Sequence, residues 1–262
     1  MLIVNKPKWY RTLQREQSFS DSYKNLSLLE WESLIKSKRL TSTNYDTVVS
    51  LDWPHFCEGA TVGCGGSNGW CYTFQGRLAS ERHINKVGLV DALAKANPEL
   101  FAETVANEVM GLVKKGKLSY ANLRYSGTGE VTYSHLPALK HISDLDVHLW
   151  GFTRVIEIAR KLRELGASVI VSCDRTSEPR FITEAIDEGF GLAYTSLGVD
   201  DSPPLGTIVT FPLHKLGRVT EVVSSNTLCP KVAEEYIRGS RKPATCQERC
   251  HRCHQISATH LV

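Results

Sequence analysis

The stretch DVHLWGFTRVIEIARKLRELGASVIVSCD, residues 146–174, decides the fold class of this chain. DVHLWGF at its start and SVIVSCD at its end are short segments rich in apolar, β-branched or aromatic residues, and each predicts a strand. Between them, residues 153–166 repeat apolar side chains at helical spacing, with Thr153 as the N-cap and Gly166 directly after the helix. A strand, a helix and a strand in this order form the unit from which parallel sheets are built.

The same alternation continues on both sides of this unit. Further strands are predicted at 47–52, 120–126, 190–198 and 207–214, and further helices at 87–96, 98–115, 135–142 and 178–189. Six such units, without a glycine-rich dinucleotide motif at the first turn, favour a barrel over a doubly wound sheet. The predicted fold class is therefore α/β, a partial (β/α)6 TIM-type barrel.

Two segments of different composition flank the predicted barrel. Residues 1–46 are polar, contain one predicted helix near 25–38, and are interpreted as an N-terminal extension or cap. The barrel itself is assigned to residues 47–222. Residues 223–262 leave the alternation of strands and helices and are rich in cysteine and charge, so they are predicted to form a C-terminal cysteine-rich, metal-binding tail.

The composition limits the function before any motif is considered. The 262-residue chain is 42% hydrophobic, enough for one large domain with a sizeable core. Its 31 basic and 28 acidic residues leave a net charge of +3, too small an excess to argue nucleic-acid binding, because counterion release rewards clustered cations. The sequence has neither the run of about eighteen apolar residues that a membrane span needs nor a signal peptide. We therefore expect a cytoplasmic protein without a membrane partner.

The eight cysteines are more than a reduced protein of this size needs for packing, and their grouping suggests metal ligands. The first group, Cys57, Cys64 and Cys71, lies in the loop HFCEGATVGCGGSNGWCYTFQG (55–76), directly after the first predicted strand. Barrels place their chemistry at this carboxyl end of the strands. Three thiolates are one ligand short of closing a zinc site or an all-cysteine iron–sulfur cluster, so a cluster held by them would keep one iron open to a small molecule.

Two other interpretations of this loop stay open. A zinc site could combine the three cysteines with His55 or His83 as the fourth ligand. The thiols could also be unrelated and buried, although the loop has few aliphatic residues to bury them. The many glycines of the loop would let its backbone wrap closely around a cluster and direct N–H groups at the cluster sulfurs.

In the order of its motifs the chain resembles the radical SAM superfamily. In that family a cysteine loop follows the first barrel strand, and an aromatic residue commonly precedes the last cysteine, as Trp70 precedes Cys71 here. The resemblance implies a [4Fe–4S] cluster on Cys57, Cys64 and Cys71 that binds S-adenosylmethionine (SAM). The family's usual spacing is Cys-x3-Cys-x2-Cys, whereas both gaps hold six residues in this chain, which puts the geometry of the loop in doubt.

A second resemblance lies in LRYSGTGEVT (123–132), at the end of the second predicted strand. This segment is similar to the family's Gly-Gly-Glu segment, which engages the amino group of the SAM methionine. Position by position, the resemblance assigns that role to Gly127, Gly129 and Glu130. Glycines allow the backbone to approach a ligand closely, and a carboxylate pairs with an ammonium group. An ordinary strand-to-helix turn would explain the same sequence.

The ends of the next two predicted strands carry polar side chains where a bound nucleotide would lie. Ser172 and Asp174 could bind the ribose hydroxyls of SAM, and Arg154 could pair with its carboxylate. Helix capping explains Thr153 and Asp174 equally well. Cys173 faces the opposite side of its strand and is predicted to be a core residue.

The second cysteine group lies in the tail CPKVAEEYIRGSRKPATCQERCHRCH (229–254). Four thiolates can close a site, so we expect a second, auxiliary [4Fe–4S] cluster or a structural zinc there, with His251 and His254 as substitute ligands. Interleaved basic residues would offset the charge of a cluster or contact phosphates. The predicted ligands are Cys229, Cys246, Cys250 and Cys253.

The resemblance implies a radical SAM enzyme, in which an electron from the cluster cleaves SAM to methionine and a 5′-deoxyadenosyl radical that abstracts hydrogen from a substrate. Its partners would be SAM and an electron donor such as flavodoxin or ferredoxin. The motifs are also similar to those of small phage-encoded proteins, which suggests a DNA nucleotide as substrate and an isomerisation as one outcome. The alternative is a non-enzymatic zinc or iron–sulfur protein that binds nucleic acid. An electron-transfer protein is disfavoured, because the Gly-Gly-Glu segment would then be idle.

Overall fold

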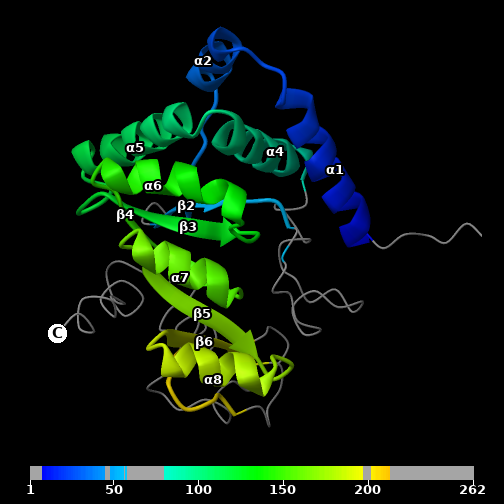
Figure 1. Ribbon diagram of the computed structural model, residues 1–262. Helices are drawn as coiled ribbons and strands as arrows, with labels where there is room; N and C mark the ends of the chain where they lie inside the picture. The colour runs from blue at the N-terminus through cyan, green and yellow to red at the C-terminus, as the bar shows by residue number, and fades with distance from the viewer. Residues whose placement is uncertain (1–7, 45–47, 56, 58–79, 197–201, 213–262) are drawn as a thin grey trace, which may run out of the picture.

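The computed structural model describes residues 8–44, 48–55, 57, 80–196 and 202–212. Within these residues the fold is α/β, with a mostly parallel sheet and helices between its strands (Figure 1). None of the helices in these ranges is both long and apolar enough to cross a bilayer.

The sheet has seven strands in sequential order, β1 to β7. Strand β1 pairs antiparallel with β2, and every later pair is parallel. Sequential order with parallel, right-handed crossovers places the connecting helices on one face of a sheet. The strands are β1 (Ser42–Asn44), β2 (Val48–Asp52), β3 (Asn122–Thr128), β4 (His148–Thr153), β5 (Ser168–Asp174), β6 (Gly191–Ser196) and β7 (Thr207–Pro212).

Two helices precede the sheet and the others connect its strands. Helix α4 and helix α5 follow β2, α6 follows β3, α7 joins β4 to β5, and α8 joins β5 to β6. A short 3-10 helix, η3, leads into α6. The bounds are α1 (Lys8–Tyr23), α2 (Leu28–Lys36), α4 (Glu81–Ala96), α5 (Pro98–Lys114), η3 (Tyr133–His135), α6 (Leu136–Asp144), α7 (Ile156–Glu164) and α8 (Pro179–Asp187).

The strand–helix–strand unit at 146–174 is confirmed, with one correction at the start of its helix. Thr153 is the last residue of β4, where it pairs with Val171, and the N-cap of α7 is Val155. The sheet register holds Thr153 extended, and its hydroxyl accepts a hydrogen bond from the Val155 N–H at 3.1 Å. The prediction of Thr153 as N-cap is therefore wrong. Gly166 does follow the C-cap, at a φ of +78° that favours glycine.

The predictions missed α1, β1 and the first turn of α4. That first turn has little apolar periodicity, but its N-cap Ser80 accepts a hydrogen bond from the His83 N–H at 3.3 Å. Helix α1 packs directly on α4, and a Cβ on Gly88 would lie 2.7 Å from Phe19 Cβ. Glycine thus permits the close approach of these two helices.

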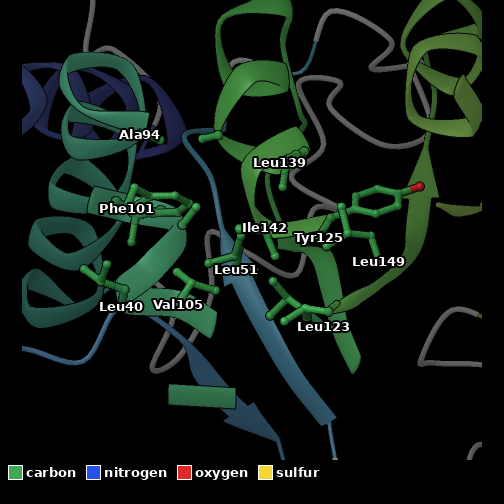
Figure 2. Packing of buried hydrophobic residues seen from close by; sticks show 14 of the residues in the cluster. Leu40, Leu51, Ala94, Phe101, Val105, Leu123, Tyr125, Leu139, Ile142 and Leu149 are labelled. Carbon is green, nitrogen blue, oxygen red and sulfur yellow. The ribbon is translucent and has the colours of Figure 1, made fainter. Parts of the chain in front are cut away.

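The main core lies between one face of the sheet and the helices. Alternate strand residues Leu123, Tyr125 and Leu149 point to this face, where Phe101 of α5 and Ile142 of α6 meet them (Figure 2). Farther along the sheet a second cluster joins β5 and β6 to α7 and α8. The predicted core residue Cys173 belongs to this second cluster and is fully buried, which confirms that prediction.

The opposite face of the sheet, here called the inner face, carries the other alternate residues, among them Arg124, Phe152, Ile170 and Phe211. The rings of Phe152 on β4 and Phe211 on β7 meet edge to face with centroids 5.8 Å apart. Two strands separate β4 from β7, so their backbones would be about 14 Å apart in a flat sheet. Side chains stand roughly perpendicular to a sheet, so this contact requires the sheet to curve toward the inner face.

Candidate functional site

The carboxyl ends of the parallel strands β2 to β5 meet at one edge of the sheet, where all candidate site residues in the described part of the chain lie. At the end of β2, Asp52 is buried and faces Thr128 of β3, whose hydroxyl donates to Asp52 Oδ1 at 3.2 Å. The hydroxyl of Ser42 donates to Asp52 Oδ2 and accepts from Lys86 Nζ at 2.7 Å. Burial lowers the pKa of the Lys86 ammonium.

The chain that leaves β2 toward the cysteine loop is fixed by Trp53. Its backbone N–H donates to the Thr128 carbonyl at 3.0 Å, and its indole N–H donates to the Tyr125 carbonyl at 2.5 Å. Its ring stacks on the imidazole of His135 with centroids 4.1 Å apart. Three contacts to two other segments hold Trp53, two of them through its indole, so the start of the loop has one defined direction. Cys57, four residues on, is partly exposed at this edge.

A buried acidic side chain supports His55, which lies between Trp53 and Cys57. Glu16 of α1 accepts hydrogen bonds from the His55 backbone N–H at 3.0 Å and contacts His55 Nδ1 at 2.5 Å. The Glu16 carboxylate favours a proton on Nδ1 of His55. Nε2 is then the ring nitrogen that can accept a hydrogen bond. On the neighbouring helix α4, burial lowers the pKa of His83 and favours its neutral form.

His55 and His83, the alternative zinc ligands, are thus brought to the same region, where His55 adds to the effect of burial in lowering the pKa of His83. The described residues alone do not complete a metal site, since no three histidine, cysteine or acidic side chains converge within them. Of the predicted ligands, only Cys57 falls in the described part of the chain. The others lie outside it: Cys64, Cys71, Cys229, Cys246, Cys250 and Cys253.

The predicted Gly-Gly-Glu segment lies beside the start of the cysteine loop. Gly127 is within β3, one residue before the strand ends, and Gly129 follows the strand with a φ of +71°. A Cβ on Gly129 would lie 2.1 Å from the Trp53 carbonyl oxygen, and one on Gly127 would lie 2.5 Å from Ser50 Oγ. Gly127 therefore allows β3 to pack closely on the side chains of β2, and Gly129 allows it to pack on the chain leaving β2.

Glu130 has an incompletely satisfied carboxylate. The side chain is only 6% exposed, and its Oε2 accepts a hydrogen bond from the Arg154 backbone N–H at 3.1 Å. Its other oxygen, Oε1, is buried with no hydrogen-bond partner among the described residues. Burial raises the pKa of Glu130 to about 7, although hydrogen bonds from the Arg154 backbone, the Thr153 side chain and the Val131 backbone oppose the rise. Such a carboxylate is stabilised by any cation that reaches Oε1.

Two further predicted site residues form an ion pair. Arg154 Nη1, directly after β4, donates to Asp174 Oδ2 at the end of β5 at 2.9 Å. Asp174 Oδ1 accepts hydrogen bonds from the Thr176 N–H at 2.8 Å and from its hydroxyl at 2.5 Å. Asp174 does not cap α8, whose N-cap is Glu178. Ser172 is partly exposed two residues before Asp174, on the same face of β5. The proposed contacts of these residues with SAM stay predictions.

Another buried acid near this edge, Asp91, is fully paired. Asp91 of α4 contacts His135 Nε2 at 2.8 Å and accepts hydrogen bonds from Lys95 Nζ at 2.6 Å and Ser20 Oγ at 2.6 Å. Burial favours a raised pKa, but these donors outweigh it and hold the pKa of Asp91 at about 2. Burial lowers the pKa of His135. This network fixes the ring on which Trp53 stacks.

Sequence reasoning missed the supporting residues of this edge. Asp52 had a usable signal, since it ends the first predicted strand as Asp174 ends a later one. Glu16 and Asp91 had none, because their histidine partners are 39 and 44 residues away in the chain. No protein-family model, curated protein or solved structure matches the chain. The geometry of this edge is therefore the basis for a functional proposal.

Proposed function

We propose that this chain is a radical SAM enzyme, with the open cluster on the loop of Cys57 and the methionine end of SAM at Glu130. The observation that carries the proposal is the buried Oε1 of Glu130, which has no partner in the described residues. An ammonium group is the natural partner for a desolvated carboxylate oxygen. The amino group of SAM supplies that charge, and the acid lies next to the chain that leads to Cys57.

The surroundings of Cys57 fit a cluster site. The chain before it is fixed by Trp53 and by the Glu16–His55 pair, so a ligand held there would keep its position. In the proposal, Cys57, Cys64 and Cys71 hold the first [4Fe–4S] cluster, and Cys229, Cys246, Cys250 and Cys253 hold a second cluster or a zinc ion. Cys173 plays no part, because it is buried in the core and burial raises the pKa of its thiol to about 11.

The proposed fold is a partial (β/α)6 barrel. Two observations support it: the parallel strands follow one another in sequential order, and Phe152 and Phe211 meet across the inner face. A doubly wound sheet reverses its strand order at a switch point, and the described strands do not. In a curved sheet, the carboxyl ends of β2, β3, β4 and β5 converge on one ligand-sized space.

Each residue at this edge is given a role in the proposal on the basis of its contacts. A cluster held by Cys57, Cys64 and Cys71 would, when reduced, supply the electron for cleavage of SAM to methionine and a 5′-deoxyadenosyl radical. Glu130 binds the ammonium of SAM, and Arg154 is held near it by Asp174 to attract the SAM carboxylate. In the proposal, the partly exposed Ser172 contacts the ribose, whereas the oxygens of Asp174 already accept hydrogen bonds from Arg154 and Thr176. A flavodoxin or ferredoxin would deliver the electron, and the substrate would be a small molecule or a DNA nucleotide.

Anaerobic reconstitution with iron and sulfide tests the proposal. The reduced protein is expected to bind about eight irons per chain, as two cubane clusters require, and to convert SAM to 5′-deoxyadenosine. Cys57→Ala should lose the product and part of the cluster absorbance, whereas the matched control Cys173→Ala should keep both. Wild-type protein that binds zinc, has no affinity for SAM and binds DNA in a salt-dependent manner would contradict the proposal and support the nucleic-acid-binding alternative.

A further inference from the structure

The inner face of the sheet holds a cation that the proposed chemistry does not use. Arg124 lies on β3, in register with Trp150 of β4. Its guanidinium carbon lies 4.9 Å from the centroid of the Phe152 ring and 5.9 Å from that of Trp150. These distances are typical of a guanidinium packed against aromatic faces. The two rings thus fix the position of the charge.

This guanidinium has no anionic partner in the described chain. No carboxylate or other hydrogen-bond acceptor of the described residues contacts it, and its Nε is shielded from solvent without a partner. A desolvated donor without an acceptor costs free energy, and the cost is larger for a charged group. Other arginines near the sheet are paired, as Arg154 is with Asp174 and Arg160 with Glu188. Arg124 is the exception among these three.

The position of Arg124 connects it to the site at the carboxyl edge. Its guanidinium is closer to Phe152 than to Trp150, and Phe152 is two residues nearer the carboxyl end of β4. The side chain therefore extends along the inner face toward the edge that carries Glu130. The ring of Phe211 lies against that of Phe152, so an anion bound beside Arg124 would lie next to apolar surface.

We propose that Arg124, held against Phe152 and Trp150, binds an oxyanion of the substrate, either a carboxylate or a phosphate group. The planar fork of a guanidinium suits both groups, because each can accept two parallel hydrogen bonds. Stacking on rings occupies the faces of the guanidinium and leaves its edge available for those bonds. As a statement about the substrate, this inference rests on the proposed function, but the binding site itself can be tested without SAM.

Calorimetric titration of the full-length protein with inorganic phosphate and, separately, with acetate tests the site. Wild-type protein is expected to bind one of the two anions with a dissociation constant near or below about 1 mM. Arg124→Gln should weaken this binding at least about tenfold, and Arg124→Lys should weaken it less, because it keeps the charge but loses the fork. The matched control is Arg180→Gln, which removes the same charge from an exposed position on α8 and should bind as the wild type does.

The outcome identifies the anion and separates this inference from the proposed function. Tighter binding of phosphate indicates a phosphorylated substrate, and tighter binding of acetate indicates a carboxylate. Equal affinities of wild type and Arg124→Gln, or no binding of either anion to the wild type, would overturn the anion site, whatever the result with SAM. Loss of binding in Arg124→Gln supports the site even if the reconstituted protein fails to cleave SAM, which would count against the proposed function alone.

Discussion

Two buried acids near the same edge of the sheet, Asp91 and Glu130, differ in how completely they are paired. Asp91 has three side-chain donors, and its pKa lies at about 2. Glu130 has donors in the Arg154 N–H, the Thr153 side chain and the Val131 backbone, but its Oε1 has no partner in the described chain, and burial raises its pKa to about 7. A fully satisfied buried acid stabilises the fold, whereas a partly satisfied one costs stability and is available to a ligand.

The first way to test this comparison is to disturb the turn that carries Glu130. Gly129→Ala should destabilise the protein by about 4 kcal/mol or more, because the new methyl group meets the Trp53 carbonyl at a positive φ. Gly116→Ala is the matched control, since Gly116 also has a positive φ but nothing lies within 4 Å of its Cβ position. It should lose only about 1 kcal/mol. Urea unfolding measures both, and equal losses would contradict the close packing at Gly129.

The second test removes the charge of the paired acid. Asp91→Asn should destabilise the protein by about 3 kcal/mol at pH 7, because it breaks a buried charged network and leaves His135 and Lys95 without their anion. The pKa of Asp91 is lowered by folding, so its contribution is present above about pH 4 and is lost as the pH falls toward 2. The difference between wild type and variant in urea unfolding should therefore shrink in acid. A difference that does not depend on pH would contradict the assigned ionisation.

The third test removes the charge of Glu130, and here we expect a gain in stability where Asp91→Asn gives a loss. Folding raises the pKa of Glu130 from its ordinary value of 4.5 to about 7, so its favourable contribution, complete below pH 4.5, is lost as the pH rises through 7. Glu130→Gln should match the wild type in stability at pH 5 and exceed it by about 2 kcal/mol at pH 8, without ligand present. Glu103→Gln, at an exposed position on α5, is the control and should change neither value. A destabilised Glu130→Gln at pH 8 would show that the carboxylate is satisfied in the native state.

The fold was predictable to the extent that local sequence patterns determine it. The unit at 146–174 was found from its periodicity, and all six parallel strands were placed close to their observed bounds. The prediction of Thr153 as N-cap was wrong because the pairing of β4 with β5 extends the strand by one residue, to Thr153 itself. The short strand β1 and the polar helix α1 were missed, since each depends on a partner that local periodicity does not report.

The site was predictable only where a motif marks it. Glu130 and its glycines came from a short resemblance, and the structure adds that the glycines fit against the chain leaving β2. The supporting pairs Glu16–His55 and Asp91–His135 join residues far apart in the sequence, and neither partner stands out alone. Arg124 could not be singled out either, because an arginine in a predicted strand gives no signal by itself. Only the structure shows that it packs on aromatic rings and lacks an acidic partner in the described chain.

We propose that Oε1 of Glu130 accepts a hydrogen bond from the ammonium group of SAM. Titration of SAM into the anaerobically reconstituted protein, with wild type, Glu130→Gln and Glu103→Gln compared, tests it most directly. Wild type and Glu103→Gln are expected to bind SAM equally, and Glu130→Gln is expected to bind it at least about tenfold more weakly while remaining folded. Equal SAM affinity in all three proteins would contradict it.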